Sequence, residues 1–306
     1  MAESPPTSVI LPTVEPGGVC EEVAAQLGED DELLVVCDAE TDPVAERADT
    51  LPDGARVVVA GEPDGCSGKA NAVAAGMEAA ESERIVWTDD DFHHPPDWLE
   101  GLHADYAVHG PTTELPVFVG TDPLSLLLEP LYVVGGTLSV YVNDLAWAGS
   151  VIFERDDLDE AGFLDELRRT VSDDGLLGEH LEVTPVKRPR RVEIGGTIRG
   201  TLERHARFTK IAHRHGPKAN AASGVGAAAV TAAGLAVPLP AIAVLTALLG
   251  ALYASFGIRR WTFLLAYPAV LASVPLMAYG LARRTFVWGG RRYRWPSKFD
   301  VRIEDE

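Results

Sequence analysis

Two long uncharged runs in the carboxyl-terminal part of the chain most constrain how it can fold. Residues 221–258 contain no charged side chain over 38 positions, and residues 261–282 contain none over 22. About 20 apolar residues in a helix cross the hydrocarbon core of a bilayer. The second run is therefore long enough for one span, and the first allows either a tight hairpin of two spans or one long, kinked element. The sequence predicts a protein that is integral to a membrane.

Basic residues flank these runs without fixing their orientation. They stand in three pairs, which are Arg214 with Lys218, Arg259 with Arg260, and Arg283 with Arg284, and Arg291 and Arg292 follow the third pair. Basic residues favour the cytoplasmic end of a span. Neither two nor three spans place all three pairs in the cytoplasm, so the number of spans and the side of the carboxyl terminus stay open at this stage.

Charge divides the chain into an acidic body and a basic, apolar tail. Residues 1–185 carry 7 Lys and Arg against 40 Asp and Glu, whereas residues 186–302 carry 19 against 3. The acidic excess disfavours a nucleic-acid partner for the body. An acid-rich surface keeps a protein soluble when salt screens repulsion, so we predict a halophilic protein. Residues 1–7 lack the pattern of a secretory signal, and we expect the body to be cytoplasmic.

Apolar runs and helical patterns alternate along the acidic body. Strand-like runs occupy residues 8–11, 32–37, 56–60 and 85–88, and residues 19–27 and 67–80 have helical character. This alternation predicts an α/β domain with a mostly parallel sheet and helices on both faces. Ligands of such sheets bind beyond the carboxyl ends of the strands.

Three adjacent carboxylates, Asp89, Asp90 and Asp91, end one of the strand-like runs. Like charges repel, so a folded protein keeps them together mainly where a cation or solvent relieves the repulsion. Alternate side chains of an extended backbone share a face, so Asp89 and Asp91 can hold one Mg²⁺ or Mn²⁺ against a diphosphate. A solvated acidic turn is the alternative. His93 and His94, which follow the triplet, can lend a metal ligand, but a histidine pair in a turn is more often solvated, and we expect both to be solvated.

Other polar residues complete a set suited to a nucleotide-sugar transferase. They are Asp38 after a strand, Asp173 and Asp174 at the start of a helix, and Arg204 and Arg207 before the first uncharged run. One carboxylate can bind the nucleoside, a metal neutralises the leaving diphosphate, and another carboxylate is a general base for an acceptor hydroxyl. Arginine binds phosphate oxygens in a bidentate fork.

Each member of this set also has a purely structural alternative. Asp38 can cap a turn. The helix dipole favours acids such as Asp173 and Asp174 in a first turn, by about 0.3–1 kcal/mol. Arg204 and Arg207 can anchor the chain at the cytoplasmic side of the membrane.

Taken in order, these stretches resemble the inverting family 2 glycosyltransferases, and within them the membrane-bound ceramide glucosyltransferase type. Residues 36–42, Val-Cys-Asp-Ala-Glu-Thr-Asp, resemble the nucleotide-binding stretch Val-Asp-Asp-Gly-Ser-Thr-Asp of that family. Residues 68–72 resemble its Lys-x-Asn segment, and residues 89–91 match its Asp-x-Asp motif.

The resemblance continues towards the carboxyl terminus. Residues 173–178, Asp-Asp-Gly-Leu-Leu-Gly, resemble the family stretch Asp-Asp-Tyr-x-Leu-Gly, with Gly175 in place of Tyr. Residues 204–210 are similar to Gln/Arg-x-x-Arg-Trp followed by Thr-Lys. Phe208 replaces the Trp of that motif, so an aromatic face is kept and the indole donor is lost. Residues 288–293 resemble a Trp-x-Gly-Arg-x-Tyr signature.

The resemblance implies a role for each matching residue. Asp174 is implied as the catalytic base, and Asp89 and Asp91 as ligands of Mg²⁺ or Mn²⁺. The residues implied in nucleotide-sugar binding are Pro12, Asp38, Lys69, Asn71, Asp89, Asp173, Arg204, Arg207 and Phe208.

We therefore predict four segments. Residues 1–190 form a cytoplasmic glycosyltransferase domain of the Rossmann-like GT-A type, and residues 191–219 form a basic interfacial segment that carries Arg-x-x-Arg-Phe. Residues 220–284 form two or three transmembrane helices, and residues 285–306 form a tail. The chain would be a multi-pass protein of the cell membrane.

The predicted enzyme is an inverting, metal-dependent hexosyltransferase of glycolipid biosynthesis. It would move a sugar from a nucleoside diphosphate sugar, with UDP favoured over GDP, to a hydroxyl of a membrane lipid. A polyprenyl-phosphate sugar synthase or a polysaccharide synthase is an alternative that shares the fold. An inactive, membrane-anchored nucleotide-sugar-binding protein is an alternative of another class. The sequence leaves the sugar and the acceptor lipid open.

Overall fold

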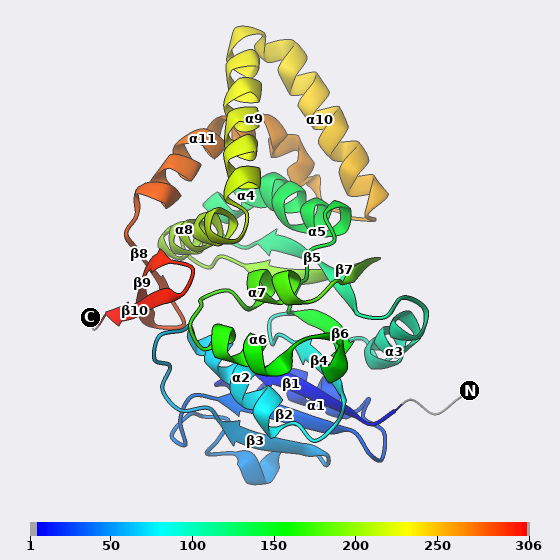
Figure 1. The fold of residues 1–306 in the computed structure, drawn as a ribbon. Helices are drawn as coiled ribbons and strands as arrows, with labels where there is room; N and C mark the ends of the chain where they lie inside the picture. The colour runs from blue at the N-terminus through cyan, green and yellow to red at the C-terminus, as the bar shows by residue number, and fades with distance from the viewer. Residues whose placement is uncertain (1–4, 305–306) are drawn as a thin grey trace. The chain divides into compact units, whose positions relative to one another are not determined.

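The computed structural model describes residues 5–304 (Figure 1). The chain divides into two compact units. Among the described residues, the first unit comprises 5–115, 141–186 and 298–302, and the second comprises 116–140, 187–297 and 303–304. The second unit thus takes a short insertion from the first half of the chain as well as the apolar carboxyl-terminal part.

In the described part of the chain, seven strands form one mixed sheet in the order β3-β2-β1-β4-β6-β5-β7. The strands are β1 (Thr7–Pro12), β2 (Glu32–Cys37), β3 (Ala55–Val59), β4 (Arg84–Thr88), β5 (Thr112–Gly120), β6 (Ser150–Glu154) and β7 (Thr184–Ile194). Strand β1 pairs in parallel with β2 and β4, and β2 pairs in parallel with β3. Strand β6 runs antiparallel to β4 and β5. The predicted α/β fold with a mostly parallel sheet is confirmed.

Helices of the first unit cover both faces of this sheet. They include α1 (Gly18–Ala24), α2 (Gly68–Ala79), α3 (Trp98–His109), α6 (Glu160–Leu167) and α7 (Asp173–His180), with short 3₁₀ turns η1 (Ala48–Thr50) and η3 (Arg155–Asp157). Successive side chains of a strand point to opposite faces. Accordingly, Ile10 of β1 packs into the core beneath α2, α6 and α7, whereas Val9 and Leu11 pack into the core beneath α1 and α3.

Helix α2 lies unusually close to the sheet at Gly76. A Cβ atom at this position would stand 2.5 Å from Cγ2 of Ile10 on β1 and 3.2 Å from Cγ2 of Val36 on β2. Glycine therefore permits the approach that brings the amino end of α2 to the carboxyl edge of the parallel strands.

The second unit contains the long apolar helices. Its elements are α4 (Pro123–Tyr132), the π-helical turn η2 (Val133–Leu138), α8 (Ile198–His215), α9 (Pro217–Ala236), α10 (Pro238–Ser255), the 3₁₀ turn η4 (Trp261–Leu265), α11 (Ala266–Ala282), β8 (Thr285–Trp288) and β9 (Arg291–Ser297). Within the described residues, four helical stretches are long and apolar enough to cross a membrane: Pro123–Val142, Pro217–Ala236, Pro238–Ser255 and Trp261–Ala282. The first of these ends in α5 (Ser139–Val142). Figure 1 shows α9 and α10 as a hairpin that projects from the other helices of this unit.

Two parts of the described structure were not predicted as strands. Strand β7 carries a run of basic residues between its buried positions Val192 and Ile194 and its start at Thr184. The tail forms a three-stranded sheet of order β10-β9-β8, in which β10 spans Asp300–Glu304. Both stretches are rich in charge, which hides the alternation by which a strand is recognised.

Candidate active site

The first turns of α2 and α7 lie side by side because buried Ser67 joins them. The hydroxyl of Ser67 caps α2 by accepting the N–H of Ala70 at 3.1 Å, and it donates to the carbonyl oxygen of Val171 at 2.8 Å. The N–H of Ser67 donates to the carbonyl oxygen of Thr170 at 3.0 Å. A serine cap contributes about 1 kcal/mol to a helix. Ser67 thus caps the start of α2 and also holds residues 170 and 171, which lead into α7.

Lys69, in the first turn of α2, forms ion pairs with carboxylates from two other elements. Its Nζ lies 2.6 Å from Oδ1 of Asp89, just beyond β4, and 2.9 Å from Oδ2 of Asp173 at the start of α7. Burial lowers the pKa of Lys69, but Asp173 and Asp89 outweigh this effect and raise the pKa well above its usual value. The group is therefore a permanent cation, and three predicted site residues are brought together.

Asp174 stands next to this cluster and is held by the backbone. Its Oδ1 accepts the N–H of Ala148 at 2.5 Å, and Ser172 caps α7 by accepting the N–H of Gly175 at 3.0 Å. Burial, and then the negative charge of Asp173, raise the pKa of Asp174 to about 7. A carboxylate with a pKa near the working pH is well matched to general base catalysis.

The acidic triplet differs from residue to residue. The side chain of Asp89 is only 20% exposed, whereas Asp90 and Asp91 are exposed. Burial raises the pKa of Asp89, although Lys69 opposes this shift. The N–H of Asp89 donates to the carbonyl oxygen of Gly149 at 3.2 Å, which fixes the end of β4 against the start of β6. The triplet is therefore not a uniformly solvated turn.

The donor chemistry of Asp89 and Asp91 fits a hard divalent cation. Within residues 5–304, no group of three or more His, Cys, Asp and Glu side chains is arranged to hold a metal ion. Mg²⁺ is typically bound by one or two carboxylates, with substrate phosphates and water completing its shell. Two carboxylates, one of them exposed, are therefore a sufficient protein contribution for a cation that arrives with a diphosphate.

A buried aromatic cluster lies behind the triplet. His94 is almost wholly buried, its Nε2 is 2.6 Å from the hydroxyl oxygen of Thr88, and its ring lies 4.1 Å from the ring of Phe92. The ring of Phe92 is in turn 5.4 Å from the ring of Trp147. The expectation that both histidines are solvated is wrong for His94, because aromatic neighbours enclose it. It is correct for His93, whose side chain is 73% exposed.

Residues 147–149 connect Asp174 to the acidic triplet, and sequence reasoning assigned them no role. The backbone of Ala148 holds Asp174, and the carbonyl oxygen of Gly149 accepts both the N–H of Asp89 and, at 3.1 Å, the hydroxyl of Thr88. A Cβ atom on Gly149 would stand 2.4 Å from the indole ring of Trp147. The signal in the sequence was a glycine two residues after a tryptophan, just before a strand.

Two of the residues implied in nucleotide binding lie at the same edge of the sheet as Asp89. Pro12 ends β1, and Asp38 directly follows β2, the parallel neighbour of β1. The Oδ2 atom of Asp42 accepts the N–H groups of Asp38 and Ala39 at 2.9 and 2.8 Å, so a carboxylate holds the turn that presents Asp38. This edge is where parallel α/β sheets bind ligands.

Asn71 is engaged with protein groups. Its amide nitrogen donates to the carbonyl oxygens of Gly61 at 2.8 Å and Ala60 at 3.3 Å, and its amide oxygen accepts from Nη1 of Arg168 at 2.7 Å. Arg168 also pairs with Glu78 at 2.7 Å. The contacts of Asn71 tie α2 to the end of β3.

The remaining predicted site residues lie on α8 in the second unit. The guanidinium carbon of Arg207 is 3.9 Å from the ring centroid of Trp288, and Arg207 is only 9% exposed. The ring of Phe208 lies 5.6 Å from the ring of Phe118. Arg204 is half-buried one turn earlier, and side chains three residues apart share a helix face. The carboxyl-terminal Trp-x-Gly-Arg-x-Tyr stretch thus supports the Arg-x-x-Arg-Phe stretch within this unit.

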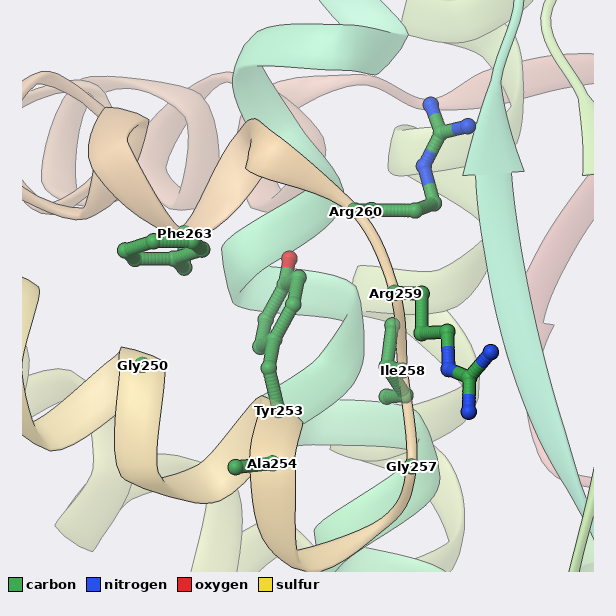
Figure 2. A pocket seen from close by; sticks show the side chains of 8 residues that line it. All are labelled: Gly250, Tyr253, Ala254, Gly257, Ile258, Arg259, Arg260 and Phe263. Carbon is green, nitrogen blue, oxygen red and sulfur yellow. The ribbon is translucent and has the colours of Figure 1, made fainter.

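A cavity of about 490 Å³ also lies in the second unit, at the corner between α10 and η4 (Figure 2). Its lining residues are Gly250, Tyr253, Ala254, Gly257, Ile258, Arg259, Arg260 and Phe263. None of these is among the predicted site residues, so the cavity is distinct from the cluster around Lys69.

Comparison with known families now identifies the domain. Residues 18–125 match the sequence model of the family described as Glycosyl transferase family 2. Residues 18–125 thus have the sequence of a glycosyltransferase family 2 domain. The matched range includes Asp38, Lys69, Asn71, Asp89 and Asp91 and ends before α7. The predicted enzyme class, a glycosyltransferase, is confirmed.

Solved structures show similarity of fold at low identity. The glucosyl-3-phosphoglycerate synthase of M. tuberculosis is 18% identical, with a TM-score of 0.43, and the match covers 68% of this chain and 78% of that one. The same synthase in complex with Mg²⁺ and uridine diphosphate is 17% identical, with a TM-score of 0.43 and coverages of 68% and 76%. The mannosyl-3-phosphoglycerate synthase from Rubrobacter xylanophilus is 18% identical, with a TM-score of 0.44 and coverages of 71% and 76%.

These similarities carry no argument about the substrate of this chain. The resemblance to the membrane-bound ceramide glucosyltransferase type remains an expectation from the sequence. A search of curated protein sequences gave no significant match.

Proposed function

We propose that this protein is a membrane-anchored, inverting glycosyltransferase that moves a sugar from a nucleoside diphosphate sugar, preferentially a UDP-sugar, to a hydroxyl of a membrane lipid. The observation that carries the proposal is the position of Asp174. Its carboxylate has a pKa raised to about 7 and stands beside the cluster of Lys69, Asp89 and Asp173 at the end of β4. A base and a diphosphate site are thereby combined in one unit.

The reaction is a single displacement at the anomeric carbon. Asp174 accepts the proton of the acceptor hydroxyl, and the acceptor oxygen forms its bond to the anomeric carbon on the face opposite the leaving group. The bond between that carbon and the diphosphate oxygen breaks, and the diphosphate leaves with the electron pair. The configuration at the anomeric carbon is therefore inverted.

Other residues of the first unit bind and orient the donor. Asp38 would bind the nucleoside, and Asp89 and Asp91 would hold Mg²⁺ or Mn²⁺, which neutralises the leaving diphosphate when bound. Lys69 forms ion pairs with Asp89 and Asp173, each of which has a carboxylate oxygen within 2.9 Å of Nζ, and its positive charge opposes the effect of burial on the pKa of Asp89. In the second unit, Arg204 and Arg207 would bind diphosphate oxygens.

Exposed apolar side chains support a membrane anchor. Leu235 on α9 is 65% exposed, and Leu239 and Leu248 on α10 are 78% and 61% exposed. Burial of a leucine side chain is worth about 1.5–3 kcal/mol, so a row of exposed leucines is costly in water and favourable in lipid. A membrane anchor in turn favours an acceptor that is itself a lipid.

The test is transfer from a panel of UDP-sugars and GDP-sugars by the purified full-length protein in high salt, with Mg²⁺ or Mn²⁺ and extracted native lipid. The expected product is a lipid-linked sugar of inverted configuration that is lost in Asp174→Asn. Asp165→Asn is the matched control, because Asp165 on α6 is 72% exposed. A water-soluble polymer would overturn the lipid acceptor, and donor binding without turnover across the panel would overturn catalysis.

A further inference from the structure

The cavity at the corner between α10 and η4 has an aromatic wall and a basic wall. The rings of Tyr253 on α10 and Phe263 on η4 form the first wall, with their centroids 6.0 Å apart. A Cβ atom on Gly250 would stand 3.4 Å from the ring of Phe263, so this ring packs closely on α10. Figure 2 shows Arg259 and Arg260 on the segment across from Phe263. Such a cavity suits a ligand with one charged end and one apolar end.

The basic wall is held in place by the way in which α10 ends. Gly257 has a φ of +68°, a conformation that favours glycine. The N–H of Gly257 donates to the carbonyl oxygen of Ala254 at 3.1 Å, and the N–H of the following Ile258 donates to that of Tyr253 at 2.8 Å. These are the two hydrogen bonds of a Schellman motif, which ends a helix with a defined turn. Arg259 therefore follows an ordered turn.

The two arginines of this wall differ in their partners. Nε and Nη2 of Arg260 lie 2.5 and 2.9 Å from the carboxylate oxygens of Glu129, and the hydroxyl of Thr262 donates to Oε1 of Glu129 at 2.5 Å. Glu129 is fully buried, so Arg260 is committed to it. Arg259 is exposed, and its side chain forms no ion pair or hydrogen bond within residues 5–304. Its N–H donors are therefore available to a ligand.

Each acidic residue in the described part of the second unit already has a partner. Four of them pair with arginines of the same unit: Glu129 with Arg260, Glu193 with Arg191, Glu203 with Arg283 and Glu304 with Arg294. The fifth, Asp122, caps α4 and accepts the hydroxyl of Thr201 at 2.6 Å. An anionic partner for Arg259 therefore has to come from outside this unit.

A second cation lies at the same corner. Nζ of Lys187 on β7 is 5.2 Å from the ring centroid of Phe256, the residue that precedes Gly257. The positive charges of Lys187 and Arg259 both favour the approach of an anion.

The length of α10 places this corner near the headgroups of a membrane that the helix crosses. Its 18 residues span about 27 Å, close to the thickness of the hydrocarbon core. Trp261, next to the two arginines, is 56% exposed, and tryptophan is enriched at membrane interfaces. Basic pockets between apolar helices are typical binding sites for anionic lipid headgroups.

We propose that this cavity binds an anionic membrane lipid, with the lipid phosphate on the guanidinium group of Arg259 and the first carbons of the chains against Ala254 and Phe263. Arginine binds phosphate oxygens through two parallel N–H groups. The volume of about 490 Å³ is sufficient for a headgroup and the start of its chains. The inference rests on the membrane anchoring of the proposed function and on no step of sugar transfer.

The test is the affinity of the purified full-length protein, in neutral detergent, for fluorescent phosphatidylglycerol, measured by anisotropy at about 1 M KCl. The Debye length is then about 3 Å, so general attraction between a basic surface and an anionic lipid is screened. Arg259→Gln removes the cation, and Ala254→Phe fills the cavity from an exposed position without changing a charge. Arg284→Gln is the matched control, because Arg284 is exposed after the last apolar helix and does not line the cavity.

The expected result is an affinity weaker by about tenfold or more for Arg259→Gln and Ala254→Phe, and unchanged for Arg284→Gln. Unlabelled phosphatidylglycerol should displace the label. Phosphatidylcholine should not, because its choline cation is repelled by the basic wall, and glycerol phosphate should not, because it lacks the chains.

Equal affinities for the intact protein and the three variants would overturn the site. Displacement by glycerol phosphate as strong as that by phosphatidylglycerol would mean a site for free phosphate and would overturn the lipid ligand. Sugar transfer is measured separately on the same preparations. Lipid binding without transfer would count against the proposed function alone, and transfer without lipid binding would count against this inference alone.

Discussion

The pKa of the Asp174 carboxyl group is set by two opposing effects, and this pKa determines the pH range in which the group can accept a proton. Burial and Asp173 favour the protonated form, whereas Lys69 and the N–H of Ala148 favour the carboxylate. The result is a pKa raised to about 7. A solvent-exposed aspartate has a pKa of about 3.9, so it would already be ionised well below pH 7.

Transfer should therefore depend on pH through the carboxylate form of Asp174. Below pH 7 the rate should fall by about tenfold per pH unit, because only the deprotonated group can act as base, and above pH 7 it should level off. The measurement is the transfer rate at saturating donor between about pH 5 and 9. A rate that stays constant from pH 5 to 8 would contradict a base with this pKa.

The raised pKa of Asp174 also predicts how the free energy of unfolding depends on pH. An unfolded aspartate has a pKa of about 3.9, so between about pH 4 and 7 the folded chain binds more protons at Asp174 than the unfolded chain does. This group's contribution to the free energy of unfolding falls as pH rises through that window. Asp174→Asn, which is neutral and can still accept the N–H of Ala148, should raise Tm above pH 7 by roughly 2–8 °C while it abolishes transfer.

Thermal unfolding in detergent at pH 4 and pH 8 checks this prediction. The gain in Tm should be present at pH 8 and absent at pH 4, where Asp174 is protonated in the folded state. Asp165→Asn, on an exposed part of α6, should leave Tm unchanged at both values. A lower Tm for Asp174→Asn at pH 8 would show that the carboxylate stabilises the fold.

Among the elements, those with an apolar face were predictable and those with charged faces were not. Strands β1, β2 and β4 appear in the sequence as apolar runs because both of their faces are buried. Strand β7 was missed because Lys187, Arg188 and other basic residues stand at its half-buried and exposed positions. The composition of a segment predicts a strand only where its side chains meet a core.

The candidate site was predictable where it follows an element boundary. The carboxylates after β4 and at the start of α7 could be found because each stands where an apolar run or a helix pattern changes. The fact that Lys69 joins them could not be predicted, since it depends on the bonds from Ser67 to Thr170 and Val171, more than one hundred residues along the chain. The roles of Ala148 and Gly149 were equally hidden, because their backbone atoms make the contacts.

The ion pair between Arg260 and Glu129, at the corner between α10 and α11, can be tested by substitution. Arg260→Gln removes the cation that faces the fully buried carboxylate of Glu129. Loss of one partner from a buried ion pair costs about 3–5 kcal/mol, so Tm should fall clearly in detergent. Arg259→Gln is the matched control, because Arg259 is exposed on the same turn and should leave Tm unchanged. Equal Tm values for the two variants would mean that the pair does not hold this corner.

At the scale of the whole molecule, the net charge of −20 is unevenly distributed, and this imbalance predicts how the protein responds to salt. The 40 acidic residues among positions 1–185 face only 7 basic ones, so most of their charges repel one another in the folded state. Salt shortens the Debye length from about 10 Å at 0.1 M to about 3 Å at 1 M and screens this repulsion. Exposed ion pairs, which salt also weakens, are individually worth only about 0–1 kcal/mol.

Repulsion should therefore dominate, and Tm should rise as KCl is increased from about 0.1 to 2 M. The comparison is between the intact protein and a variant in which exposed acids such as Glu46, Asp49 and Asp53 are changed to Gln or Asn. Fewer like charges leave less repulsion to screen, so the variant should be more stable at low salt and should gain less from added KCl. A Tm that falls with salt would mean that ion pairs outweigh repulsion in the acidic body, and the adaptation to high salt would have to be abandoned.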